Sequence, residues 1–136
     1  MDLFNSGIVR FHIGQTPSAA GIQSALEEAV RVTADCPYRR TFHSDQGWAY
    51  PMKSYTKRLK EKRIFQSMSR KGNCPDNSVM ENFFGLLLNY DGRVYHSYEG
   101  LKTAIEEYIV YYNEHRSKES LGWLSPKEYR RRHCAV

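Results

Sequence analysis

The sequence contains no apolar run that approaches the roughly 18 residues a membrane-spanning helix requires. Its opening residues, MDLFNSGIVR, also lack the basic segment and long apolar stretch of a secretion signal. We therefore expect a cytoplasmic protein with no membrane partner.

Cysteine is scarce, and histidine shows no ligand-like pattern. The three cysteines, Cys36, Cys74 and Cys134, are far apart, odd in number and outside any CxxC pair. The five histidines show none of the paired spacings of a zinc site. Neither a disulfide framework nor a zinc knuckle is indicated, so we expect free thiols.

The sequence has fewer acidic than basic residues. The 136 residues carry 20 Lys and Arg against 15 Asp and Glu, a formal net charge of +5. A polyanion is a plausible partner, although such basicity is also common on solvated surfaces. The sequence has no internal repeat, no low-complexity segment and no dividing linker, and its length suits one domain, residues 1–136.

The first half alternates predicted strands and helices. Residues 8–13 are rich in β-branched and aromatic side chains and predict a strand. Thr16 is a candidate cap, with Pro17 first in a helix whose apolar stripe runs through residues 22–30. Residues 41–44 predict a short strand that ends at Asp45. A strand-helix-strand order favours an α/β sheet with helices on its faces.

The remaining chain continues this pattern. We expect a helix over residues 52–63, a strand over 64–69, a basic loop over 70–77 and an apolar-striped helix through 79–87. Asp76 or Asn77 can cap that last helix. An amphipathic helix is predicted over residues 98–115, and Ser125, Pro126 and Glu128 predict a capping box that opens another.

Asp45 and Glu81 are the candidate pair for chemistry. One ends a strand, the other lies on a helix after the basic loop, and thirty-five residues separate them. Two carboxylates that converge from separate elements can hold Mg²⁺ or Mn²⁺, which prefer oxygen ligands. The alternative is an ordinary turn aspartate and a solvated acid in the first turn of a helix.

Three stretches carry a resemblance. "FHSDQGWAY", "SMSRKGNCPDNSVMENFFGLL" and "YIVYYNEHRSKESLGWLSPKEY" together resemble the integrase-type (DDE-type) catalytic core domain of bacterial insertion-sequence transposases, which are related to retroviral integrases. The match covers most of the chain from "DLFNSGIVRF" onward. It implies a ribonuclease-H-like fold, a mixed sheet flanked by helices. It also implies metal-dependent DNA strand cleavage and strand transfer by two aspartates and a glutamate.

The resemblance assigns roles to both carboxylates. Asp45 in "HSDQG" matches the second aspartate of the triad, and Glu81 in "DNSVMENFF" matches the glutamate, with the family's thirty-five-residue gap kept. Both are then catalytic residues and ligands of Mg²⁺ or Mn²⁺. The implied partner is DNA, both transposon ends and target, and a homo-oligomer stays an open alternative.

Two departures limit what the resemblance implies. Asp2 matches a structural position and not the first triad aspartate, so we expect the chain to be N-terminally truncated, without the first strand or strands. We therefore expect it to be catalytically inactive as given, because one of three carboxylates is missing. Leu88, seven positions after Glu81, stands where the family usually has a lysine that can reach DNA.

Five basic side chains are candidate DNA contacts. Arg70 and Lys71 lie in the basic loop, and Lys53, Lys57 and Lys60 lie on one predicted helix. Each group can contact phosphate, and each can equally be solvated surface. Two alternative functions remain: a non-catalytic DNA-binding or interaction protein derived from a transposase, and a DNA or structured-RNA nuclease with the same fold.

Overall fold

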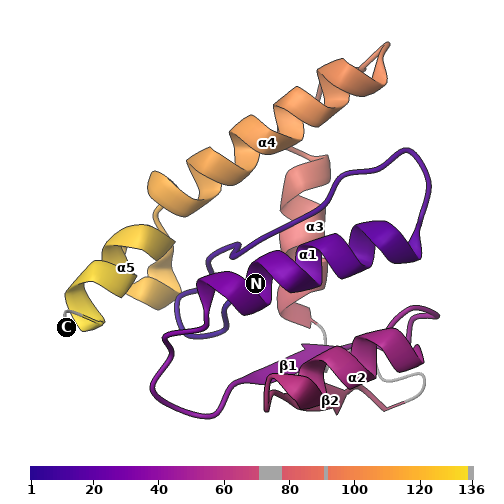
Figure 1. Ribbon diagram of the computed structural model, residues 1–136. Helices are drawn as coiled ribbons and strands as arrows, with labels where there is room; N and C mark the ends of the chain where they lie inside the picture. Colours follow the sequence, from indigo (N-terminus) through magenta and orange to yellow (C-terminus); the bar gives the residue numbers. More distant parts are fainter. Residues whose placement is uncertain (71–77, 91, 135–136) are drawn as a thin grey trace. The chain divides into compact units, whose positions relative to one another are not determined.

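The computed structural model describes residues 1–70, 78–90 and 92–134 (Figure 1). The chain divides into two compact units. One consists of His12–Glu81, and the other consists of Met1–Phe11 with Asn82–Val136. We call the first the strand unit and the second the helical unit. Among the described residues, no helix is long and apolar enough to cross a membrane.

The strand unit is built on two parallel strands. Strand β1 (Thr41–Ser44) pairs with β2 (Phe65–Met68), with Thr41 opposite Phe65 and Ser44 opposite Met68. Two of the three predicted strands are thus confirmed. β1 has its predicted span, and β2 is one residue shorter at each end than the predicted range of 64–69. The chain between them forms helix α2, which gives the strand-helix-strand order expected of an α/β fold.

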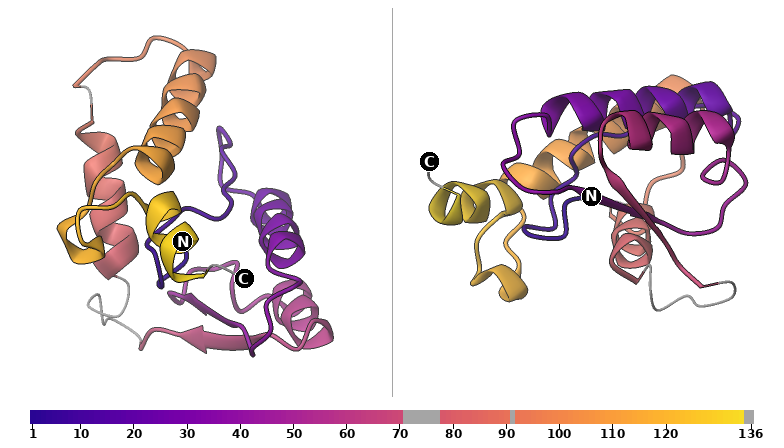
Figure 2. Two further views of the ribbon diagram at one scale, coloured as in Figure 1. Left: turned by 90° about the vertical axis from the view of Figure 1, so that its left-hand side faces the viewer. Right: turned by 60° about the horizontal axis from the view of Figure 1, so that its bottom comes forward.

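Two helices accompany the strand pair (Figures 1 and 2). Helix α1 spans Ala19–Val32 and α2 spans Lys53–Glu61, close to the predicted ranges. The predicted cap of α1 at Thr16 is wrong. Ser18 caps it instead, because its extended backbone lets the hydroxyl accept a hydrogen bond of 3.1 Å from the Gly21 N–H.

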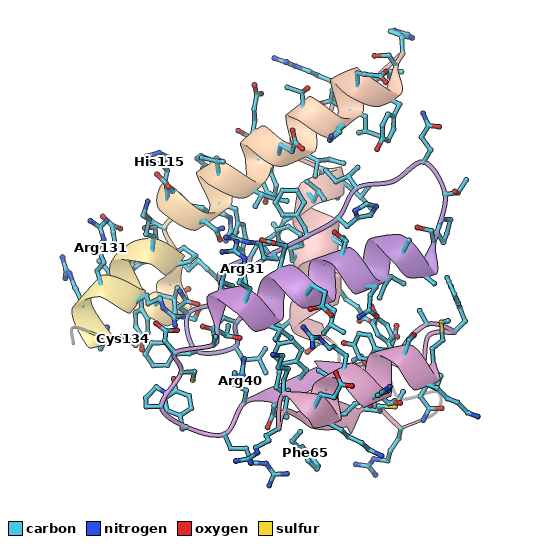
Figure 3. All side chains as sticks on the ribbon, in the orientation of Figure 1. Arg31, Arg40, Phe65, His115, Arg131 and Cys134 are labelled. Carbon is cyan, nitrogen blue, oxygen red and sulfur yellow. The ribbon has the colours of Figure 1, made fainter. Side chains whose placement is uncertain are left out.

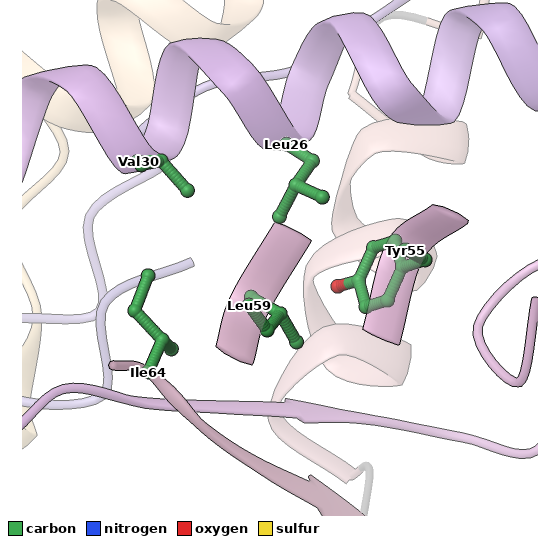
Figure 4. Packing of buried hydrophobic residues seen from close by; sticks show 5 residues of the cluster. All are labelled: Leu26, Val30, Tyr55, Leu59 and Ile64. Carbon is green, nitrogen blue, oxygen red and sulfur yellow. The ribbon is translucent and has the colours of Figure 1, made fainter. Parts of the chain in front are cut away.

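The core of the strand unit lies between α1, α2 and the start of β2. Leu26 and Val30 of α1 meet Tyr55 and Leu59 of α2, together with Ile64 (Figure 4). Leu59 is 1% exposed. These side chains fall at helical spacing on both helices, so burial of the two apolar stripes holds α1 and α2 together.

The helical unit contains most of α3 (Ser78–Leu88), α4 (Tyr98–Glu114), the short η2 (Glu119–Leu121) and α5 (Pro126–His133). Phe83 of α3 packs edge-on against Tyr112 of α4, with ring centroids 5.0 Å apart. The predicted capping box is confirmed. The Ser125 hydroxyl accepts from the Glu128 N–H, and the Glu128 carboxylate accepts from the Ser125 N–H at 2.9 Å.

The strand predicted over residues 8–13 is wrong, because this segment is extended but pairs with no strand among the described residues. A side chain takes the place of a partner strand. The Asn113 amide accepts from the Ile8 N–H at 2.8 Å and donates to the Ile8 carbonyl at 3.0 Å. Buried Asn5 similarly donates to the Pro126 carbonyl at 2.9 Å. The Asn113 amide thus satisfies the backbone groups of Ile8 that the prediction assigned to a sheet.

Replacement of Asn113 by alanine should destabilise the helical unit. The change leaves the Ile8 N–H and carbonyl without their partner, and each partly buried orphan group costs roughly 1 kcal/mol or more. We expect a loss of about 1–3 kcal/mol in urea unfolding. Asn89→Ala, which removes an exposed side-chain bond to the Gly85 carbonyl, is the control and should change stability much less. Equal losses in the two variants would contradict this account.

The strand unit should lose stability in alkali through Tyr55. Burial raises the pKa of Tyr55 to about 12, and the neighbouring Tyr50 adds to the rise. The folded state therefore keeps a proton that the unfolded chain loses near pH 10, so this contribution is complete below pH 10 and falls as pH rises toward 12. The loss should reach about 2–3 kcal/mol. Tyr55→Phe should flatten the decline in unfolding free energy between pH 9 and 11.5, and an unchanged decline would disprove the assignment.

Candidate functional site

Asp45 follows the last residue of β1 and opens a tight turn. Its Oδ1 accepts a hydrogen bond of 2.8 Å from the Gly47 N–H, the short-range bond that favours aspartate at turns. A Cβ at position 47 would lie 2.9 Å from that Oδ1, so any other residue there would displace the carboxylate. The residue is exposed, and no bond from Oδ2 occurs within the described chain. One oxygen is thus anchored while the other faces solvent.

Polar side chains tie this turn to β2. His43 contacts the Ser67 hydroxyl through Nδ1 at 3.0 Å and the Ser69 hydroxyl through Nε2 at 3.1 Å. Gln46 donates to the Ser69 carbonyl at 3.0 Å. The Ser69 N–H in turn donates to the Ser44 carbonyl at 2.9 Å, one step beyond the paired strands. Bonds on both sides of Asp45 therefore fix where its backbone leaves the sheet.

Tyr50 closes the turn on its other side. Its carbonyl accepts from the Gln66 amide at 3.0 Å, and its ring packs edge-on against Tyr55 with centroids 5.4 Å apart. Burial raises the pKa of the Tyr50 phenol above its ordinary value, and the charge of Asp45 raises it further. The phenol therefore stays neutral at physiological pH and leaves Asp45 as the local charge.

Glu81 lies in the first turn of α3 and is exposed. A carboxylate in this position is favoured by the partial positive charge at a helix N-terminus. The helix itself is confirmed, but its predicted caps Asp76 and Asn77 lie outside the described residues. Glu81 and Asp45 both belong to the strand unit, and their convergence on one ion stays a prediction.

The candidate DNA contacts fall in two places. Arg70 is exposed directly after Ser69, and since β1 and β2 are parallel it follows the same end of the strand pair as Asp45. Lys71 lies outside the described residues. Lys53, Lys57 and Lys60 are all exposed along α2, where Lys57 also lies 3.9 Å from the Glu61 carboxylate.

The structure shows the surroundings of Asp2 and Leu88, the two departures from the family pattern. The Asp2 carboxylate pairs with the Arg130 guanidinium and accepts from the Phe4 N–H at 2.9 Å. It is thus engaged within the helical unit, in keeping with a structural role. Leu88 is 81% exposed at the end of α3. Its apolar side chain therefore faces solvent at the position where the family usually has a lysine.

Sequence reasoning missed the polar side chains that hold the turn, His43, Gln46, Gln66, Ser67 and Ser69. The signal was present in the strand register, because a parallel pairing of the two predicted strands places His43 opposite Ser67. Across residues 1–70, 78–90 and 92–134, no group of three or more His, Cys, Asp or Glu side chains gathers as a metal cluster. A metal at Asp45 therefore needs donors beyond those the described residues bring together.

Two models of one protein family, the integrase core domain, match successive parts of the chain. A model of the integrase core domain matches residues 1–74, which contain β1, Asp45 and β2. A second integrase core domain model matches residues 81–133, which begin at Glu81. The two matched segments together cover the stretches on which the resemblance was based, apart from residues 75–80.

Relatives of known sequence carry transposase names. The chain is 44% identical over 132 residues to an uncharacterized transposase-like protein of Haemophilus influenzae, covering 95% of this chain and 60% of that protein. It is 41% identical over 133 residues to the putative transposase InsK for insertion sequence element IS150 of Escherichia coli, covering 96% of this chain and 46% of that protein. The chain thus spans about half the length of these relatives.

A solved structure shares the fold. A chain in the cryo-electron microscopy structure of the simian T-cell lymphotropic virus intasome in complex with PP2A regulatory subunit B56 gamma aligns with a TM-score of 0.65 over 85% of this chain and 41% of that chain. The sequence identity is 13%, so the likeness concerns the fold alone. It confirms the α/β, ribonuclease-H-like class that the sequence predicted.

Asp45 should be replaceable by asparagine without loss of the turn. Asparagine keeps a side-chain oxygen that can accept from the Gly47 N–H, whereas alanine removes it. We expect Asp45→Asn to leave the unfolding free energy within about 0.5 kcal/mol and Asp45→Ala to lower it by about 0.5–1.5 kcal/mol. Urea unfolding of both variants checks this. Equal stability of the two would mean that the turn does not depend on the side-chain oxygen.

Proposed function

Since the chain belongs to the integrase core domain family, we propose that it is part of an insertion-sequence transposase and contributes Asp45 and Glu81 to a metal-dependent centre for DNA strand cleavage and strand transfer. The observation that carries the proposal is the exposed Asp45 carboxylate at the carboxyl end of β1. One oxygen is anchored by the Gly47 N–H, and the turn is tied to β2 on both sides.

The donor chemistry suits a hard divalent cation. Mg²⁺ and Mn²⁺ prefer oxygen ligands and bind through one or two carboxylates together with water and phosphate oxygens. Asp45 and Glu81 supply two exposed carboxylates, and the hydrogen bond at Oδ1 of Asp45 leaves Oδ2 for an ion. Bound there, the ion would activate a water or hydroxyl and stabilise the leaving oxygen of a phosphodiester.

The chain's own residues would orient and attract the substrate. Gly47 and Gln46 hold the Asp45 turn, and Arg70 presents a cation at the same end of the strand pair, where it can contact a DNA phosphate. Lys53, Lys57 and Lys60 add positive charge along α2. The proposed partners are transposon ends and target DNA in the cytoplasm, and self-association stays an open part of the proposal.

A non-catalytic DNA-binding protein is the second candidate. Leu88 favours it, because a leucine that is 81% exposed cannot make the phosphate contact that a lysine would make at that position. The two candidates differ in one respect: only the first requires Asp45 and Glu81 to bind a metal.

Manganese binding by the chain, with duplex DNA present, separates the two candidates. We expect Asp45→Asn and Glu81→Gln each to lower Mn²⁺ affinity at least about tenfold in electron paramagnetic resonance titrations, because each removes a charged oxygen ligand. Asp35→Asn, which neutralises an exposed loop aspartate of the same unit, is the matched control and should bind normally. If all four proteins bind Mn²⁺ equally, the metal-centre proposal fails.

The same variants should keep or gain DNA affinity in chelator. Removal of a carboxylate near phosphate reduces repulsion, so binding measured by fluorescence anisotropy in EDTA should be unchanged or tighter. A loss of binding in EDTA would instead mean that the carboxylates support the fold of the DNA-contacting surface.

A further inference from the structure

A basic groove lies at the opposite end of the strand pair from Asp45. It is an open hollow of about 810 Å³ at the amino ends of β1 and β2, where α1 and α2 end. Its described lining consists of Cys36, Pro37, Tyr38, Arg39, Arg40, Lys60, Lys62, Arg63 and Ile64. We call this surface the basic groove. Five of these nine residues are Lys or Arg, and none of the nine is acidic.

One of the five cations has a structural task. Arg40 donates to the Val30 carbonyl at 3.2 Å, to the Thr33 hydroxyl at 3.0 Å and to the Lys62 carbonyl at 3.4 Å. It thereby satisfies carbonyl groups at the C-terminal ends of both helices. The partial negative charge of a helix C-terminus commonly attracts basic residues. Figure 3 shows it near Phe65, whose N–H donates to the Arg40 carbonyl at 2.9 Å.

The other four cations have no comparable partner. Arg39, Lys60, Lys62 and Arg63 are exposed, and within residues 1–70, 78–90 and 92–134 none is hydrogen-bonded or ion-paired to a carboxylate. Arg39 lies over the Phe65 ring at 5.0 Å, which orients its guanidinium without neutralising it. By contrast, Arg58 one turn back on α2 is paired with Glu27 at 2.5 Å. The groove therefore gathers four exposed cations that form no ion pair among the described residues.

We propose that the basic groove binds the phosphate backbone of duplex DNA, at a surface separate from the Asp45 turn. The inference rests on the proposed function for the identity of the polyanion, and it adds a second contact to the site already described. Four exposed cations around one hollow, none of them in an ion pair among the described residues, match the chemistry of successive phosphates, which Lys and Arg neutralise with release of counterions. The hollow, at about 810 Å³, is also larger than a single small anion needs.

The strand pair sets the distance between the two contacts. Asp45 lies five positions after Arg40, and an extended chain rises about 3.3 Å per residue, so the two ends lie about 16 Å apart. One DNA strand advances about 3.4 Å per base pair. A duplex lying along the strands would therefore reach the groove about five base pairs from the phosphate at Asp45.

The test is DNA binding by a groove variant in metal-free buffer. Arg39→Gln with Lys62→Gln removes two exposed groove cations and leaves Arg40 in place. The matched control, Lys102→Gln with Lys127→Gln, removes the same charge from the helical unit, where both lysines are paired with glutamates. A fluorescein-labelled duplex of about 20 base pairs is titrated in EDTA at several salt concentrations, and circular dichroism checks the fold of each variant.

The groove variant should bind about tenfold more weakly at roughly 0.1 M salt, and the slope of log affinity against log salt should fall by about 2. The control should keep its DNA affinity within about twofold of the parent chain, and its salt slope should stay close to that of the parent chain. Equal affinity and slope in the two variants would overturn the proposal. So would poly-glutamate competing as well as unlabelled DNA at equal charge, because the groove would then be a general anion surface.

Failure of the groove and failure of the proposed function are distinguishable. The groove variant should bind Mn²⁺ as the parent chain does, since it alters neither carboxylate. A chain that loses DNA affinity on groove substitution but shows no dependence of Mn²⁺ binding on Asp45 or Glu81 would support the groove and exclude the metal centre. The reverse result would support the metal centre and exclude the groove.

Discussion

The parallel pairing of β1 with β2 is the constraint on which the strand unit depends. Because the strands run in the same direction, both carboxyl ends lie at one edge and both amino ends at the other. Asp45 and Arg70 leave from the first edge, and the basic groove opens at the second. Four paired residues per strand form a weak ladder alone, so packing of α1 and α2 through Leu59 must hold it in place.

Polar side chains add hydrogen bonds between the Asp45 turn and β2 to those of the paired strands. The imidazole of His43 reaches two serine hydroxyls of the neighbouring strand region, and Gln46 and Gln66 each bond a backbone carbonyl across the turn. Each such bond contributes only about 1 kcal/mol, but together they limit where the Asp45 carboxylate can lie. A ligand held in advance loses little conformational freedom when an ion binds, which is the physical advantage of so tight a turn.

The helical unit uses a different solution for its extended segment. Asn113 bonds the Ile8 N–H and carbonyl, which a neighbouring strand would otherwise satisfy, and Asn5 donates to the Pro126 carbonyl at the start of α5. The residues of 8–13 have the composition of a strand, and that composition does favour the extended backbone they adopt. Whether an extended segment joins a sheet depends on what lies beside it, and here an amide from α4, more than a hundred positions away, lies beside Ile8.

The sequence by itself determined the helices, both paired strands, the capping box at Ser125 and the position of Asp45 at a strand end. These depend on local periodicity and turn chemistry, which neighbouring residues decide. The metal-binding role of Asp45 and Glu81 came from the resemblance. Only the tertiary structure decided that Ser18 caps α1, that His43 supports the Asp45 turn and that Arg39 and Lys62 share one groove. Such contacts join residues far apart in the chain, and no local pattern specifies which of them will meet.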